Sequence, residues 1–246
     1  MQLKVDLNLD FHDKNILERK WGFKHDPSSN FMLTKNQSGY LCLYIKTFPR
    51  FHPVFVDFYS QKIFSRVAVG KRKDSLFKAV KVANKENPTI LDATAGFGRD
   101  AATLSQYGFS VSLLERNKLL SALLSDGVER LNDSISQNKN PSNCNINLLC
   151  GVDFFELSNQ GVNFDVVYLD PMFPVVNYKS LVKKESQFLQ AIVGSDLDQD
   201  NLLQPAMNIA LKKVVVKRLC SSDYLNNKTP SYSIKSKVIR FDIYLV

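Results

Sequence analysis

Residues 89–100 read TILDATAGFGRD. The first of them, 89–91, form an apolar run of strand length, and small residues with two glycines, Gly96 and Gly98, follow. Small residues allow a ligand to approach the backbone closely, where larger side chains would obstruct it. The stretch therefore predicts a strand, a tight turn and the start of a helix beside a ligand. A glycine turn that only joins a strand to a helix is an equally good interpretation of this stretch alone.

The same rhythm of strand, turn and helix continues towards the end of the chain. Further strand-length runs are largely apolar, as strands covered on both faces of a sheet must be. They lie at residues 110–114, 146–149, 166–169 and 213–216. Helices are predicted between them, at about 100–107, 118–132, 184–193 and 200–211, and residues 233–246 are predicted to add a closing antiparallel strand or hairpin. The alternation predicts an open α/β sheet that binds its ligand beyond the C-terminal ends of the strands.

The N-terminal part of the chain has a different pattern. Residues 3–68 contain short alternating or aromatic-rich runs, such as 40–45 and 54–59, interrupted by prolines and a glycine. A basic segment with helical potential follows at 71–85 and ends before Pro88. We predict a small β-rich accessory domain at residues 1–72 and an α/β domain at 73–246. The basic Lys-Arg-Lys run at 71–73 suggests that the first domain helps to hold a polyanionic partner.

Composition excludes several classes of protein. With 246 residues, 44% of them hydrophobic, the chain can bury a full core, and a net charge of +8 suits a polyanionic partner without proving one. No apolar run approaches the ~20 residues of a membrane span, and the first residues lack a secretory signal, so we expect a cytoplasmic protein. The four cysteines and three histidines lack ligand spacing. We therefore expect no metal site and no disulfide framework.

Two carboxylates follow the second and third predicted strands. Glu115 could accept two hydrogen bonds from ribose hydroxyls, and Asp153, after Gly151, could accept one from an adenine amine. Each also has an ordinary structural interpretation, Glu115 as a surface acid and Asp153 as a helix N-cap. Taken together they predict a nucleoside ligand, which either a methyltransferase or a nicotinamide-dependent dehydrogenase would bind.

The loop after the fourth predicted strand is the most informative segment. Residues 168–174 read YLDPMFP, in which two prolines make a rigid, non-helical loop at the ligand edge. The loop is similar to the Asp/Asn-Pro-Pro-aromatic loop of methyltransferases that modify exocyclic amines, with Met172 in place of the second proline. In such a loop Asp170 would accept hydrogen bonds from the amine and could also take its proton, and Phe173 would stack on the base. A purely structural turn is the alternative.

A family resemblance extends over nearly the whole chain. The motifs DATAGFGRD, LLERN, DGVER, VVYLDPMFP, SLVKKE, VGSDLD and KKVVVKR occur in this order, preceded by RKWGFKHD and VFVDF and followed by RFDIY. The chain resembles bacterial small-subunit (16S) ribosomal RNA guanine-N2 methyltransferases of the methyltransferase J family. The resemblance implies a Rossmann-like class I methyltransferase sheet, S-adenosyl-L-methionine (SAM) as cofactor, and 16S ribosomal RNA or the assembled small subunit as partner.

The resemblance also implies roles for individual residues. Those implied to bind SAM, together with Gly96 from the glycine turn, are Arg99, Asp100, Glu115, Arg116, Val152, Asp153 and Asp170. Val152 and Asp153 depart from the serine pair that the family pattern leads us to expect, which puts the polar contact there in doubt. The residues facing the guanine are Asp170, Pro171 and Phe173. Candidates for RNA phosphate contacts are Lys183, Lys184, Lys217 and Arg218.

Three other functions are weighed against this one. A methyltransferase of the same chemistry could act on an exocyclic amine of another RNA or DNA base, or on a protein amide. A non-catalytic, basic RNA-binding protein of ribosome assembly would need Gly96, Glu115 or Asp170 to be disabled, and all three are intact. A dehydrogenase would leave the DPMFP loop without a purpose.

Overall fold

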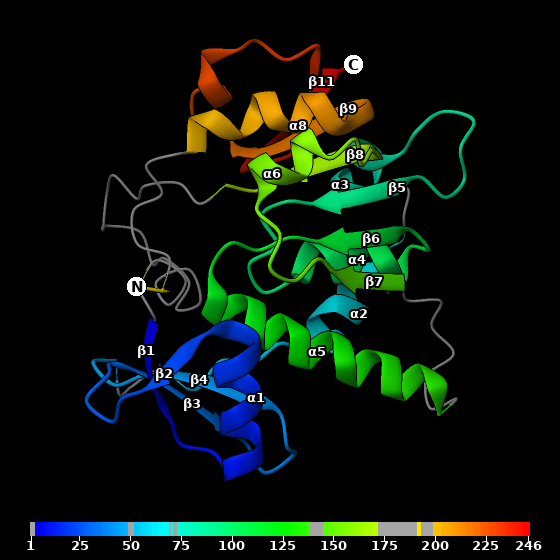
Figure 1. The fold of residues 1–246 in the computed structure, drawn as a ribbon. Helices are drawn as coiled ribbons and strands as arrows, with labels where there is room; N and C mark the ends of the chain where they lie inside the picture. Colours follow the sequence, from blue (N-terminus) through cyan, green and yellow to red (C-terminus); the bar gives the residue numbers. More distant parts are fainter. Residues whose placement is uncertain are drawn as a thin grey trace.

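A computed structural model describes residues 3–48, 52–68, 70, 73–137, 145–171, 191–192 and 199–246. Its larger sheet has seven strands in the order β10-β11-β9-β8-β5-β6-β7 (Figure 1). The strands are β5 (Thr89–Asp92), β6 (Ser110–Leu113), β7 (Asn145–Leu148), β8 (Phe164–Leu169), β9 (Ala210–Leu219), β10 (Tyr232–Lys235) and β11 (Ile239–Leu245). Strands β5 to β9 are parallel, and β11 is antiparallel to both β9 and β10. The predicted open α/β sheet and its closing hairpin are confirmed.

Helices cover both faces of this sheet. One face packs against α3 (Ser75–Val80), α4 (Arg99–Gln106) and α5 (Lys118–Ser136), and the other against α6 (Phe154–Asn159) and α8 (Leu203–Ile209). Within β8, Val166 and Tyr168 belong to the first core, and Val167 and Leu169 to the second. This two-sided burial explains why the strands read as continuous apolar runs.

The direction of chain progression reverses at β5. From β5 the chain continues outward through β6 to β7 on one side, and through β8 to β9 on the other. Ligands of open α/β sheets bind at such a switch point, beyond the C-terminal ends of the strands. The residues that follow β5, β6 and β8 are therefore the ones to examine for function.

A smaller sheet is formed by the N-terminal residues. Its order is β2-β1-β3-β4, and its elements are β1 (Leu3–Leu7), α1 (Phe11–Trp21), β2 (Phe23–His25), β3 (Phe31–Lys35) and β4 (Leu41–Ile45). Helix α1 is absent from the sequence-based description. Both ends of this helix nevertheless carry ordinary cap residues. Asp10 accepts a hydrogen bond from Asp13 N at the N-terminal end, and Gly22 ends the helix with φ 67°.

Other predicted elements differ from the structure. The aromatic run 54–59 is not a strand; Val54 alone pairs with Leu43 in an isolated bridge. In the predicted basic helix only α3 is helical, and a turn with Asn84 at φ 58° follows it. The predicted helix 200–211 is divided into a 3-10 turn, Gln199–Leu202, and α8, because β9 already begins at Ala210. The helix predicted at 184–193 lies outside the described residues apart from 191 and 192.

The two sheets share one apolar core. Helix α5 lies between them in Figure 1, and buried residues of both sheets belong to the same cluster. At Gly127 of α5, a Cβ atom would lie 2.5 Å from Val56 Cγ1, so glycine is what allows this close approach. The division into domains at residues 72 and 73 stays a prediction. No described helix is long and apolar enough to cross a membrane.

Candidate functional site

The glycine turn after β5 lies at the switch point. Backbone hydrogen bonds from Ala93 N to Tyr168 O (3.0 Å) and from Leu114 N to Asp92 O (2.9 Å) hold the ends of β8, β5 and β6 together. Gly98 has φ 69°, and a Cβ there would lie 2.8 Å from Phe58 Cε1. A larger residue at this position would strain the backbone and collide with Phe58. The packing of Phe58 against Gly98 thus fixes the conformation of the turn.

Glu115 closes this turn from the neighbouring strand. Its Oε2 accepts a hydrogen bond from Gly96 N (2.8 Å), and its Oε1 accepts one from Asn117 N (2.8 Å). The structure therefore brings together two residues predicted to bind the cofactor, Gly96 and Glu115. A carboxylate oxygen can accept more than one hydrogen bond, so Glu115 retains the capacity to accept from ribose hydroxyls.

Asp170 follows β8 at the same edge. Its backbone N–H donates to Thr94 Oγ1 (2.6 Å), and its carboxylate Oδ2 accepts from Lys217 Nζ (2.6 Å). Burial and the neighbouring Asp100 carboxylate raise the pKa of Asp170, and the Lys217 ammonium opposes this effect. The backbone of Asp170 is thus held by Thr94, which follows β5, and its carboxylate by Lys217 of β9.

Asp100 lies at the centre of a network of charges. Its Oδ1 accepts from Arg66 Nη1 (2.7 Å), and its Oδ2 accepts from Lys217 Nζ (2.8 Å) and from the Tyr168 hydroxyl (2.6 Å). Burial disfavours the charged carboxylate, but Lys217 and Arg66 together hold the pKa of Asp100 well below its usual range. Asp100 is therefore ionised, and it joins the glycine turn to the end of β9 and to α2 (Gln61–Ala68).

Two further carboxylates complete this network. Asp74 accepts from Arg66 Nε (2.9 Å) and from the Tyr107 hydroxyl (3.0 Å). Asp92 is almost wholly buried, and burial, with repulsion from Asp100, raises its pKa well above the usual value. Besides Asp92, the network holds three carboxylates, Asp74, Asp100 and Asp170, and two cations, Arg66 and Lys217. The cluster has an excess of negative charge, which suits a cationic ligand such as a sulfonium.

Asp153 caps a helix. Its Oδ1 accepts hydrogen bonds from Phe155 N (2.8 Å) and Glu156 N (3.2 Å) at the start of α6, and Val152 packs against the core of that face. The structure thus shows Asp153 as the helix N-cap that was its alternative interpretation. Because a carboxylate has two oxygens, the cap leaves the predicted adenine contact open as a prediction.

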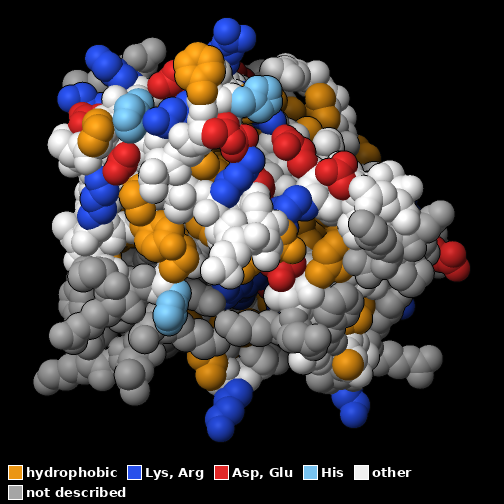
Figure 2. Space-filling view, turned by 90° about the horizontal axis from the view of Figure 1, so that it is seen from below, with side chains coloured by type: hydrophobic (Ala, Val, Ile, Leu, Met, Phe, Trp, Pro, Cys, Tyr) orange, Lys and Arg blue, Asp and Glu red, His pale blue; other side chains and the backbone are white. Residues whose placement is uncertain are grey.

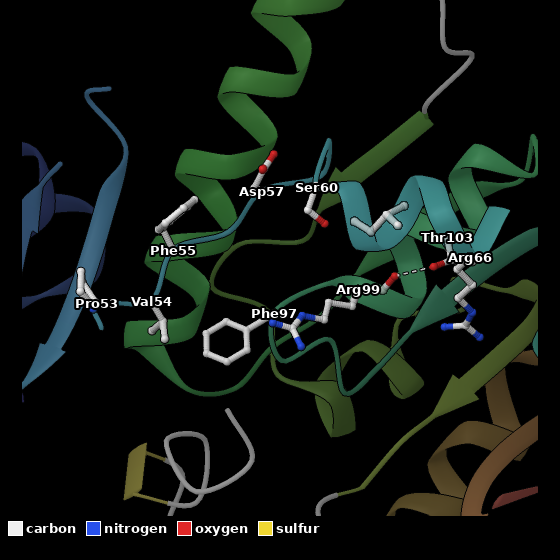
Figure 3. A pocket seen from close by; sticks show the side chains of 10 residues that line it. Pro53, Val54, Phe55, Asp57, Ser60, Arg66, Phe97, Arg99 and Thr103 are labelled. Carbon is white, nitrogen blue, oxygen red and sulfur yellow. Dashed lines mark hydrogen bonds between the residues drawn. The ribbon is translucent and has the colours of Figure 1, made fainter. Parts of the chain in front are cut away.

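Arg99 points to the outer side of the glycine turn. Its guanidinium carbon lies 5.9 Å from the centre of the Phe97 ring, and both residues line a cavity of about 520 Å³ between α4 and residues 53–66 (Figure 3). Arg116 is exposed beyond β6. Their contacts with SAM stay predictions.

Lys217 and Arg218 lie on opposite faces of β9. Lys217 is engaged by Asp100 and Asp170, whereas Arg218 is buried and its Nε donates to Asp223 O (3.0 Å). These contacts favour a role for Lys217 within the carboxylate network over the predicted phosphate contact. Phe173, Lys183 and Lys184 lie outside the described residues, whereas Pro171 is described and buried.

Five members of this site have no role in the sequence-based predictions: Arg66, Asp74, Asp92, Thr94 and Tyr168. Thr94 and Tyr168 stand inside motifs that had been singled out, so their neighbours could have indicated them. Arg66 has no local signal, since Asp100 is 34 residues away in the sequence. Among the described residues, no group of His, Cys, Asp and Glu is arranged to hold a metal ion.

Known proteins are similar to this chain over most of its length. A family model described as "Putative SAM-dependent methyltransferase" matches residues 16–246. Ribosomal RNA small subunit methyltransferase J of Tolumonas auensis is 43% identical over 80% of this chain and 80% of its own length, and that of Pseudoalteromonas translucida is 41% identical over 94% and 92%. A crystal structure of a SAM-dependent methyltransferase from Neisseria gonorrhoeae superposes with a TM-score of 0.69 at 28% identity, covering 98% of this chain and 95% of that one.

These similarities agree with the geometry. The glycine turn, Glu115 and Asp170 follow three adjacent strands of a class I methyltransferase sheet, and the relatives match on both sides of them. The expected fold and the expected SAM cofactor are confirmed. The chain belongs to the family of SAM-dependent methyltransferases whose curated relatives are named ribosomal RNA small subunit methyltransferase J.

Proposed function

We propose that this protein methylates the exocyclic N2 amine of a guanine in small-subunit (16S) ribosomal RNA. The observation that carries the proposal is the Asp170 carboxylate, held at the end of β8 beside the glycine turn by Thr94 and Lys217. The relatives named ribosomal RNA small subunit methyltransferase J supply the class of substrate. The guanine and its N2 atom come from the resemblance of the DPMFP loop and its flanking motifs.

The residues after β5 and β6 fit SAM as cofactor. At Gly96 an added Cβ would meet only Thr94 O within 4.0 Å, so the backbone there is open to close approach, and the Glu115 carboxylate beside it offers acceptors for ribose hydroxyls. Further contacts are assigned by family pattern to Arg99, Asp100, Arg116, Val152, Asp153 and Asp170. When bound, SAM supplies an electrophilic methyl group on a sulfonium.

Asp170 would act on the target amine. An exocyclic amine is a poor nucleophile, because its lone pair is delocalised into the ring. Lys217 donates to Oδ2 of Asp170, and we assign Oδ1 as the acceptor of an amine hydrogen. A hydrogen bond accepted there favours a pyramidal amine nitrogen, on which the lone pair is localised. The raised pKa of Asp170 favours transfer of the amine proton to its carboxylate.

The neighbours of Asp170 hold it ready for this role. Pro171 restricts the backbone directly after it, so the carboxylate is oriented before a substrate arrives. Phe173 would stack on the guanine. Lys217 bridges Asp170 and Asp100, and the Tyr168 hydroxyl donates to Asp100, so the amine acceptor and the residues at the glycine turn form one connected unit.

We also propose that the N-terminal region helps to hold the RNA. The basic run at 71–73 motivates this proposal, but Lys71 and Arg72 lie outside the described residues, and several described lysines pair with acids, such as Lys4 with Asp26 (3.4 Å) and Lys46 with Asp6 (2.7 Å). Blue and red side chains are interspersed on the face seen in Figure 2. Contact with RNA would therefore rest on shape and aromatic side chains. A ribosomal RNA substrate is consistent with a cytoplasmic location.

The proposal is tested by methylation of defined substrates. Purified protein and isotopically labelled SAM are incubated with unmethylated 16S RNA, with assembled small subunits and with DNA, and the products are digested to nucleosides for mass spectrometry. We expect label in N2-methylguanosine from one of the two ribosomal substrates. Label in an adenine or cytosine product would instead support the rival exocyclic-amine methyltransferase. An absence of label from all substrates, in protein that binds SAM, would support the non-catalytic RNA-binding protein.

A further inference from the structure

A cavity of about 520 Å³ lies beside the glycine turn, outside the edge formed by Glu115 and Asp170. Its walls come from the segment after β4, from α2 and from the start of α4. The lining residues used below are Phe55, Asp57, Arg66, Phe97 and Arg99. In Figure 3, Pro53, Val54 and Phe55 lie at one end of the cavity and Arg66 at the other, with Phe97 and Arg99 between them.

The wall that carries Phe55 is anchored on three sides. Val54 exchanges backbone hydrogen bonds of 2.8 and 3.0 Å with Leu43, and Arg130 of α5 donates to Val56 O (2.5 Å). The Phe55 ring makes an edge contact with Tyr40 at 5.6 Å between ring centres. The cavity is therefore built into the fold, and a ligand entering it would order little of the chain.

The lining combines aromatic and cationic groups. Phe55 keeps 39% of its surface exposed, which is unusual for phenylalanine and leaves part of this residue accessible to a ligand. The Arg99 guanidinium lies over the Phe97 ring, with its central carbon 5.9 Å from the ring centre. Asp57, whose Oδ1 accepts from Tyr59 N (2.9 Å), adds an acceptor for a base amine.

We propose that this cavity is a subsite for one unstacked nucleotide of single-stranded RNA next to the modified base. The base stacks on Phe55, and an exocyclic amine of the base donates to the Asp57 carboxylate. Single-stranded RNA is commonly recognised by bases laid on aromatic side chains. Arg99 and Asp100 are adjacent in the chain, so a nucleotide held here would lie close to the Asp100 network that holds Asp170. The inference rests on the proposed RNA substrate and deepens it.

A tryptophan at position 55 tests the contact directly. The native chain has one tryptophan, Trp21, which is 7% exposed and so gives a steady background. In Phe55→Trp, we expect the added fluorescence to be quenched by a mixed-sequence single-stranded oligoribonucleotide, and much less by the same strand annealed to its complement. Tyr232→Trp is the matched control, because Tyr232 is 45% exposed on β10, at the far edge of the large sheet. Equal quenching in both variants, or equal quenching by the duplex, would overturn the inference.

Removal of the ring supplies the second measurement. Phe55→Ala should raise the Kd of the oligoribonucleotide about 5- to 30-fold and raise the KM of any RNA that the protein methylates. Tyr232→Ala should change neither constant. The Kd of SAM, measured by calorimetry, should stay unchanged in Phe55→Ala. A weaker SAM Kd would overturn the inference by assigning the cavity to the cofactor, and an unchanged oligoribonucleotide Kd would also overturn it.

The two proposals can fail separately. If the native protein methylates ribosomal RNA but Phe55→Ala has an unchanged RNA Kd and KM, the subsite is wrong and the proposed function stands. If no RNA is methylated, the proposed function fails, and the fluorescence and Kd measurements still decide whether the cavity binds a nucleotide.

Discussion

Lys217 is the residue whose chemistry is least expected from its position in a strand. Its ammonium bridges Asp170 and Asp100 at 2.6 and 2.8 Å, so it balances two carboxylates that would otherwise repel each other. Burial lowers the pKa of Lys217 and the two carboxylates raise it. The net effect is a raised pKa, so Lys217 stays charged across the pH range in which enzymes are assayed. A permanent cation here keeps Asp170 able to accept hydrogen bonds.

Replacement of Lys217 should change the pH dependence of methyl transfer. In Lys217→Met, burial and the Asp100 carboxylate act on Asp170 without an opposing cation, so the pKa of Asp170 rises further. As the pH is lowered, the variant should therefore lose activity at a higher pH than the native protein does. We expect a rate about 10- to 100-fold lower near neutral pH, the size of a lost charge-assisted hydrogen bond. Lys217→Arg should restore most of the rate and the native profile. An unshifted acid limb in folded Lys217→Met would contradict this role.

Glu115 should contribute to SAM affinity in two ways. Glu115→Ala removes the acceptors for ribose and also releases Gly96 N and Asn117 N, so we expect a loss of about 1.5–3 kcal/mol in SAM binding. Glu115→Gln keeps one oxygen acceptor and should lose less. Calorimetry on both folded variants measures this, and native affinity in Glu115→Ala would remove Glu115 from the cofactor site.

Local pattern explains which site residues could be predicted from the sequence. Gly96, Glu115 and Asp170 each follow an apolar strand, and the fold brings such positions to one edge. The partners of Asp100 could not be predicted, because Arg66 and Lys217 are 34 and 117 residues away and only the folded chain brings them together. The same limit applies to Asp153, where the choice between helix cap and cofactor contact depends on the orientation of one carboxylate.

At the scale of elements, helix α5 depends on a glycine in its interior. Alanine at position 127 would favour the helix by up to ~1 kcal/mol in an isolated helix, but its Cβ would lie 2.5 Å from Val56 Cγ1. We therefore expect Gly127→Ala to lower the free energy of unfolding by about 1–3 kcal/mol, as overpacking does. Chemical denaturation measures this. The double variant Gly127→Ala, Val56→Ala should recover part of the loss relative to the sum of the single variants, and simple additivity would show that the contact is not the cause.

Elements covered on both faces were the easiest to predict. The strands of the large sheet are continuous apolar runs because α3, α4 and α5 cover one side and α6 and α8 the other. Helix α1 was missed because its polar residues give only a weak amphipathic pattern, although Asp10 and Gly22 marked its ends. The run 54–59 has the composition of a strand but makes only the single bridge of Val54, since its side chains pack against α5 and the glycine turn.

At the scale of the whole molecule, the N-terminal sheet and the methyltransferase sheet share a core. A fragment beginning at Asp74 would uncover the side of α5 that packs against Val56 and Phe58, and it would remove Arg66 from Asp74 and Asp100. We expect this fragment to lack a cooperative thermal transition and to bind SAM weakly. A fragment that melts cooperatively and binds SAM with native affinity would show that residues 1–73 are dispensable for the fold.

The account as a whole depends on Asp170 acting in the transfer of the methyl group. The most direct measurement is the single-turnover rate of methylation of 16S RNA or small subunits at saturating SAM, compared between the native protein and Asp170→Ala, with circular dichroism to show that the variant is folded. Saturating cofactor removes any effect of weaker SAM binding from the comparison. We predict that Asp170→Ala is slower by roughly 10²–10³-fold, as expected for the loss of one preorganised hydrogen-bonding group. A folded variant that methylates at nearly the native rate would contradict the account.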